Sequence, residues 1–183
     1  MRYYDRYDSP LGEIWMGSDG ECLCGLWLTG QRNFDIGRAR TGQRIDLQIF
    51  RETRQWLELY FSGKAPDFTP KLSLSGTPFR LMVWKMLLEI PYGETTTYGR
   101  LAELAAKKCG RERMSAQAVG GAVGNNPISI IVPCHRVVGA DGSLTGYAGA
   151  WIRKPGFWNG KRRMPLNKKG PRFGLVKPGS CVI

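Results

Sequence analysis

The chain has 183 residues and a formal net charge of +12, a length that favours one compact unit or two small domains. Nine of its 27 Lys and Arg residues lie in residues 151–183, which contain no Asp or Glu, so residues 1–150 carry a net charge of only +3. The charge is therefore weak evidence that residues 1–150 bind nucleic acid. No apolar run approaches the roughly 18 residues of a membrane span, and the start lacks a secretory signal. We expect no membrane association and a cytoplasmic location, or a nuclear one in a eukaryote.

The five cysteines stand at positions 22, 24, 109, 134 and 181, and the chain has one histidine, His135. In the absence of an export signal, reduced thiols are expected instead of a disulfide framework. Cys22 and Cys24 form a C-x-C pair, which is not the usual spacing of zinc ligands, and we interpret them as small buried apolar residues. We therefore expect neither a metal nor a cofactor.

Residues 1–74 predict a small α/β domain that ends in a linker. Apolar and polar residues alternate over 12–17 and 22–28, between glycines, as they do in antiparallel strands. A helix is predicted next, over 50–61, and Gly63 and Pro66 end it. Its apolar face consists of Phe50, Thr53, Trp56, Leu57 and Tyr60.

Residues 75–149 predict a second domain that is mostly helical. Pro78 begins a helix with an apolar face. Thr97 can cap a helix over 98–106, and Ser115 can cap another over 116–124. Two short helices joined by a compact turn are typical of helix-turn-helix DNA binding. After them, residues 128–132 are predicted as a buried strand from their apolar composition.

The predicted helix over 116–124 contains two central glycines, Gly120 and Gly121, which cost roughly 1 kcal/mol each relative to alanine. Something must approach its backbone closely, and two explanations stay open: tight packing against another helix, or insertion of a slim helix into a DNA groove. A helix of small residues fits a narrow groove and offers few side chains that can identify bases. We infer sequence-independent binding in the minor groove.

Cys134 beside His135 is the strongest chemical signal in the chain. A nucleophilic cysteine reacts as the thiolate, and a nearby imidazole can take its proton. Neighbours on a regular strand point to opposite faces, so these two side chains can cooperate only if the chain turns there. Pro133 favours such a turn.

The sequence around this pair resembles the O6-alkylguanine-DNA alkyltransferase family. The resemblance covers residues 77–149, and Ser9-Pro10-Leu11-Gly12 resembles the start of the family's smaller amino-terminal domain. It implies an α+β fold, with an antiparallel-sheet, ribonuclease H-like domain followed by a winged-helix-like domain that contains a helix-turn-helix. The active-site motif is matched by P-C-H-R-V at 133–137, and further motifs are matched in order at 93–98, 118–121, 126–127 and 146–149.

By that resemblance, the protein repairs DNA by moving an alkyl group from O6-alkylguanine, with O4-alkylthymine as a second candidate, to Cys134, once per molecule. His135 acts as the base through a water, and Asn126 braces the turn. The target base must be flipped out, because its O6 carbon is out of reach inside a stacked duplex. We expect a monomer that binds double-stranded DNA through the minor groove. The residues implied in contacts with DNA or the flipped guanine are Tyr98, Gln117, Ala118, Gly121, Val137, Tyr147 and Ala148.

The chain departs from the family at two places. Gln117 stands where many members have an intercalating arginine, so we expect weaker DNA binding without a change of function. After Gly149, a helix with a Leu-Leu pair and a histidine-orienting glutamate are missing. The shifted reading frame from Gly149 onward can encode Leu-Leu-Glu-Trp-Glu. We therefore hypothesise that residues 150–183 are an out-of-frame, disordered basic tail, and we expect slow transfer.

Three alternatives stay open. A natural lineage-specific tail is the alternative to a frameshift. A DNA-binding sensor of alkylated bases, or an inactive alkyltransferase homologue, is the alternative to a repair protein. Sensors of that kind lack the acceptor cysteine that this chain keeps. A cysteine hydrolase would need an orienting Asn or Asp and an oxyanion hole around a peptide cleft, and no further signature supports one.

Overall fold

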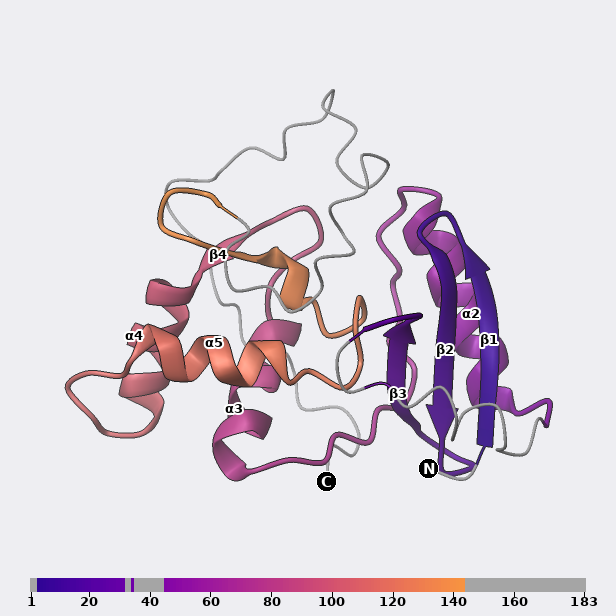
Figure 1. Ribbon diagram of the computed structural model, residues 1–183, viewed down its shortest axis with the longest axis horizontal. Helices are drawn as coiled ribbons and strands as arrows, with labels where there is room; N and C mark the ends of the chain where they lie inside the picture. The colour runs from indigo at the N-terminus through magenta and orange to yellow at the C-terminus, as the bar shows by residue number, and fades with distance from the viewer. Residues whose placement is uncertain (1–2, 32–33, 35–44, 144–183) are drawn as a thin grey trace.

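A three-stranded antiparallel sheet, in the order β1-β2-β3, forms the amino-terminal lobe (Figure 1). The structure is a computed structural model, and it describes residues 3–31, 34 and 45–143. The strands predicted over 12–17 and 22–28 are confirmed. The three strands are β1 (Tyr3–Ser9), β2 (Gly12–Ser18) and β3 (Leu23–Leu28).

The two faces of this sheet bury different side chains, as the alternation within a strand requires. Ile14 and Met16 belong to the main hydrophobic core. Trp15 and Trp27 belong to a separate aromatic cluster. Gly25 is required beside Trp27, because a Cβ at position 25 would lie 1.7 Å from the indole ring.

Helix α2 (Gln48–Phe61) packs against this sheet (Figure 1). It confirms the predicted helix and begins two residues earlier. Phe50 and Leu57 are fully buried in the main core. The linker after α2 then returns to the edge of the sheet, where Leu23 forms a parallel bridge with Leu72.

The carboxy-terminal lobe is mostly helical, and the predicted helix starts are confirmed. Pro78 begins α3, Thr97 accepts a hydrogen bond from the Arg100 amide, and Ser115 accepts from two amides of the next helix. The two helices of the predicted helix-turn-helix pack against each other and against α3. The elements of the whole carboxy-terminal lobe are α3 (Pro78–Leu88), β4 (Thr96–Thr97), α4 (Tyr98–Lys108), α5 (Ala116–Gly124), the 3₁₀ helix η1 (Cys134–Arg136) and β5 (Val137–Val138). The predicted helix-turn-helix consists of α4 and α5.

Trp84 ties α3 to α5, although its role was not apparent from the sequence. Its indole N–H donates to the carbonyl of Ala122 at 2.8 Å, and the side chain is almost fully buried. Two-residue strands β4 and β5 pair in parallel beside these helices, with Thr96 opposite Val137. The predicted α+β class is therefore confirmed.

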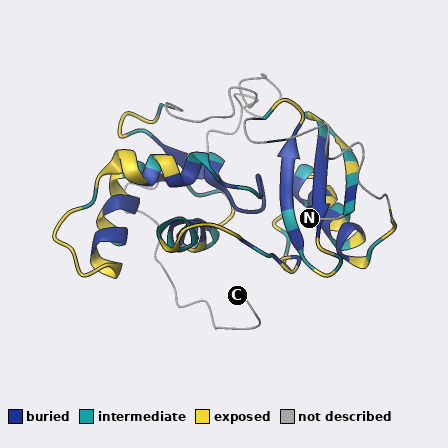
Figure 2. Ribbon diagram, turned by 60° about the horizontal axis from the view of Figure 1, so that its bottom comes forward, coloured by how far each residue is buried: buried dark blue, intermediate teal, exposed yellow. Residues whose placement is uncertain are grey.

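One hydrophobic cluster spans both lobes, from Leu26 on β3 to Val123 on α5. Figure 2 shows buried residues along the sheet and through the middle of the helical lobe, whereas residues 107–113 are exposed. Within the described ranges, none of the helices has the length and apolar character needed to cross a bilayer.

Candidate active site

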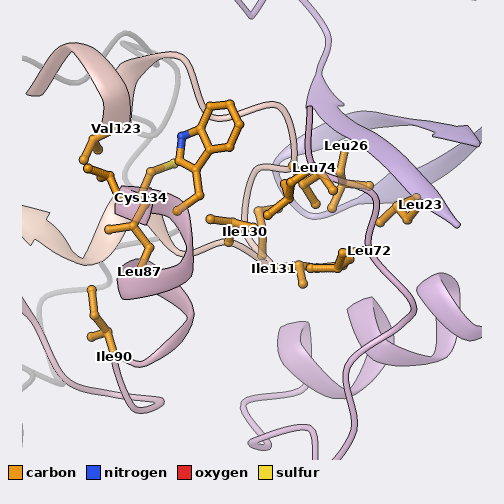
Figure 3. Packing of buried hydrophobic residues seen from close by; sticks show 14 of the residues in the cluster. Leu23, Leu26, Leu72, Leu74, Leu87, Ile90, Val123, Ile130, Ile131 and Cys134 are labelled. Carbon is orange, nitrogen blue, oxygen red and sulfur yellow. The ribbon is translucent and has the colours of Figure 1, made fainter. Parts of the chain in front are cut away.

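Cys134 lies in a single turn of 3₁₀ helix, which Pro133 precedes. Successive residues of such a helix differ by about a third of a turn, so Cys134 and His135 do not point to opposite faces. The turn that their cooperation requires is thus confirmed. The cysteine is only 4 % exposed, and in Figure 3 it lies beside Leu87 and Val123 at the junction of α3 and α5.

Residues 128–132 form a buried turn, so the strand predicted there is wrong. Only Ile128 makes a strand-like bridge, with Leu26 of β3, and the chain then turns at Ile130, whose φ is 72°. A β-branched residue is strained in this left-handed region and needs support from its surroundings. Apolar composition could not distinguish a buried strand from a buried turn.

Asn126 provides part of that support. Its Nδ2 donates to the carbonyls of Ile128 at 3.2 Å and Val132 at 2.8 Å, and its Oδ1 accepts from the Ile128 amide at 3.0 Å. The side chain is buried, so each bond satisfies a polar group that water does not reach. Asn126 thereby closes the turn that leads directly to Cys134.

The edge strand β3 supports the same turn from the amino-terminal lobe. The Leu26 amide donates to the Pro127 carbonyl at 2.9 Å, and the Leu26 carbonyl accepts from the Ser129 amide at 2.8 Å. The Ser129 hydroxyl also donates to Gln31 Oε1 at 3.0 Å. The position of Cys134 therefore depends on both lobes.

His135 contacts the amino-terminal lobe through Tyr60 of α2. The Tyr60 hydroxyl and the His135 Nε2 are 2.9 Å apart, and the other ring nitrogen, Nδ1, is also buried. Burial, and secondly the positive charge of Arg136, lower the pKa of His135 to about 3. The imidazole is therefore neutral at physiological pH, as a general base must be before it takes a proton.

An aromatic cluster surrounds this histidine. The Tyr60 ring meets His135 and Tyr92 edge-on, with centroids 6.1 and 5.8 Å away. Arg136 is buried, donates to the Ile90 carbonyl at 2.8 Å, and lies over the Tyr92 ring. Sequence analysis missed Tyr60 and Tyr92 as parts of the site, because nothing local in the sequence places α2 or the segment after α3 beside residue 135. Arg136 stands in the matched motif but had no predicted role.

Tyr98 begins α4 and is half-buried near the cysteine. Burial raises the pKa of its hydroxyl, and the negative charge of a Cys134 thiolate raises it further. A Cβ at Gly120 would meet the Tyr98 ring at 3.8 Å, an ordinary van der Waals distance. Tyr98 therefore packs beside α5 and lies close enough to Cys134 to sense its charge.

The exposed face of α5 presents Gln117, Ala118 and Gly121. A Cβ at Gly121 would meet nothing within 4 Å among the described residues, and one at Gly120 would be accommodated. Tight packing between the described helices therefore does not account for the two glycines. This leaves a slim, open face that an external partner can approach.

The remaining predicted residues divide into two groups. Val137 is buried in β5, next to the cysteine turn. Tyr147, Ala148 and the whole of 150–183 lie outside the described residues. In the part of the chain that the structure describes, no three His, Cys, Asp or Glu side chains are grouped so that they could share a metal ion.

Comparison with known proteins identifies the family of this chain. Two models of the 6-O-methylguanine DNA methyltransferase match it, that of the ribonuclease-like domain at residues 2–74 and that of the DNA-binding domain at 78–161. The methylated-DNA–protein-cysteine methyltransferase of Methanosarcina acetivorans is 44 % identical over 80 % of this chain and 89 % of its own length. The one from Mycobacterium tuberculosis is 42 % identical over 84 % of this chain and 88 % of its own length.

A solved structure agrees with this match. The crystal structure of Mycobacterium tuberculosis OGT in complex with DNA superimposes with a TM-score of 0.71 at 41 % identity, and covers 86 % of this chain and 91 % of its own. Family models therefore account for both lobes, and the fold is shared. The chain belongs to the 6-O-methylguanine DNA methyltransferase family.

Proposed function

We propose that Cys134 is the acceptor residue of this DNA-repair methyltransferase, which transfers the alkyl group of O6-alkylguanine in DNA to its own sulfur. One observation carries the assignment: the 3₁₀ turn holds Cys134 and His135 together, beside Tyr98 and the open face of α5. Of the described cysteines, Cys134 alone adjoins a histidine.

The chemistry is a displacement at the alkyl carbon. His135 takes the proton of the Cys134 thiol through a water, and the thiolate sulfur attacks the carbon. A carbon–sulfur bond forms as the carbon–O6 bond breaks, and its electron pair stays on the guanine. The guanine regains a proton on the ring, which balances the one lost by the thiol. Because the thioether is stable, each molecule acts once.

The target base has to leave the duplex before this step. Cys134 is buried within the protein, and a base inside the stack cannot reach it. We infer that α5 enters the minor groove, where its small residues Ala118 and Gly121 permit close approach, while Gln117 fills the gap left by the flipped base. Tyr98 then contacts the flipped guanine, and the Val137 carbonyl lines its pocket. For Tyr147 and Ala148, which lie outside the described residues, a role in that pocket is implied by the family resemblance alone.

Two consequences concern the protein as a whole. One acceptor cysteine serves one lesion, so a monomer suffices for the reaction. Because the substrate is duplex DNA, the expected location is the cytoplasm of a prokaryote or the nucleus of a eukaryote.

The test uses a duplex that carries O6-methylguanine. One methyl group should be added to the peptide that contains Cys134, with no turnover beyond one equivalent, as mass spectrometry can measure. Cys134→Ala should abolish transfer and keep DNA binding, whereas the matched variant Cys109→Ala, at an exposed cysteine, should transfer normally. Repeated turnovers, or a methyl group on another cysteine, would refute the proposal.

A further inference from the structure

We propose that Tyr60 is a positioning residue for the transfer reaction, contributed by the amino-terminal lobe, and that its hydroxyl holds His135 in the tautomer protonated on Nε2. The inference rests on the proposed role of His135 as the base. It adds to that function a residue from the ribonuclease-like lobe, 75 positions away from the histidine along the chain.

The geometry of Tyr60 is that of a fixed partner. Its side chain is largely buried, and the ring stacks on Trp56 of the same helix with centroids 5.2 Å apart. Phe61 and Tyr92 meet the ring edge-on at 5.5 and 5.8 Å. These contacts hold the hydroxyl in one place, 2.9 Å from His135 Nε2.

The hydroxyl remains neutral in this position. Burial raises the pKa of Tyr60 to about 12, although the neighbouring Arg136 opposes part of the shift. Tyr60 is therefore not a second base. A neutral hydroxyl can accept a hydrogen bond from Nε2–H, both in the neutral imidazole and in the imidazolium that forms when the thiol loses its proton.

The tautomer determines whether the histidine can act. A neutral imidazole carries one proton, and only the nitrogen without it can accept another. With Nε2–H donating to Tyr60, the lone pair lies on Nδ1, which serves the Cys134 thiol through the water. Without the hydroxyl, the proton is free to move to Nδ1, and the base is lost for part of the time.

The chain suits a direct test because His135 is its only histidine. In the ¹⁵N-labelled protein at pH 7, long-range ¹H–¹⁵N spectra should show a protonated Nε2 and an unprotonated Nδ1. Tyr60→Phe keeps the ring contacts and removes only the hydroxyl. In this variant the ¹⁵N chemical shifts of Nδ1 and Nε2 should move closer together, because the two tautomers exchange. Single-turnover transfer should slow about three- to tenfold, the decrease expected for the loss of one neutral hydrogen bond.

Tyr7→Phe is the matched control. Tyr7 stacks on Phe61, next to Tyr60 in the same lobe, with a ring centroid distance of 6.2 Å. That variant should change neither the nitrogen shifts nor the rate. A wild-type histidine protonated on Nδ1 would overturn the inference without any variant, and so would unchanged nitrogen shifts in Tyr60→Phe, even if its rate fell. If the wild-type protein transferred no methyl group, the proposed function would fail, while the spectra would still decide the role of Tyr60.

Discussion

The side-chain amide of Asn126 donates a 2.8 Å hydrogen bond to the carbonyl of Val132, two residues before Cys134. This bond closes a turn that contains Ile130 at a positive φ and that also pairs with Leu26 of β3. The conformation that presents Cys134 is thus maintained by a few hydrogen bonds against local backbone strain.

Asn126→Ala should therefore destabilise the protein and slow transfer. It removes the hydrogen bond to the buried Ile128 amide and leaves that amide without its acceptor, which costs about 1 to 3 kcal/mol. The Ile128 and Val132 carbonyls lose one donor each but keep the amides of Val132 and Cys134. We expect a loss of unfolding free energy in that range, measured by urea titration. Asn125→Ala, at the less buried neighbouring position, should cost less. Equal losses at the two positions would argue against a special role for Asn126.

Tyr98→Phe should slow transfer more than it weakens binding to undamaged duplex. The half-buried Tyr98 lies near Cys134, and in the proposed reaction its hydroxyl contacts a base only after that base has been extruded. Because one neutral hydrogen bond is lost, the single-turnover rate should fall by about threefold to tenfold. Tyr4→Phe, in the separate aromatic cluster of the sheet, should leave both quantities unchanged. Parallel losses of rate and affinity in Tyr98→Phe would limit Tyr98 to packing or to a phosphate contact.

Gly121→Ala should stabilise the free protein and weaken its binding to DNA. The added Cβ meets nothing within 4 Å in the described part of the chain, and alanine in a helix is favoured over glycine by about 0.5 to 1 kcal/mol. In the proposed complex, the same methyl group would obstruct the close approach of the α5 backbone to the minor groove. Thermal unfolding and fluorescence anisotropy with a labelled duplex measure the two effects. An undiminished affinity would show that this face of α5 does not lie against DNA.

Acid should destabilise the fold through His135. The unfolded chain takes a proton near the ordinary histidine pKa of 6.5, whereas the folded protein does so only near the lowered pKa of about 3. Between these values the unfolded state binds more protons, so stability falls as the pH falls, by at most about 1.4 kcal/mol per unit. The loss should be smaller than that limit, because His135 keeps part of its surface exposed.

Most carboxylates have pKa values of roughly 4. Urea titrations between about pH 7.5 and 5 therefore isolate the contribution of His135 to the pH dependence of the unfolding free energy. His135→Gln has no group that titrates there, and its unfolding free energy should depend less on pH. If the two proteins had the same slope, the histidine would titrate alike in the folded and unfolded states.

The expected orienting partner of His135 differs from the one in the structure. The family resemblance predicts a carboxylate partner, and the sequence contains no Asp or Glu after Asp141. The partner described here is the Tyr60 hydroxyl, which comes from the other lobe. In the sequence, Tyr60 was identified only as one position of an apolar helix face. Its polar end had no predicted role.

By itself, the sequence determined the locally encoded parts of this protein. Caps and apolar spacing act within a few residues, so the start of α3, the whole of α5 and the strands β2 and β3 were predicted correctly. Pro133 indicated the turn at Cys134, which the structure confirms, and the motif at 133–137 predicts that Cys134 is the acceptor.

Only the tertiary structure decided how these parts meet. Residues 128–132 form a turn instead of a strand because Asn126 and the edge of β3 satisfy the polar groups of their backbone. Asn126 lies just before this turn in the sequence, whereas Leu26 of β3 is far from it and reaches it only in the folded protein. The contact between Tyr60 and His135 likewise depends on how the two lobes pack. Such contacts result from burying apolar surface throughout the whole chain, a global balance that no short stretch of sequence encodes.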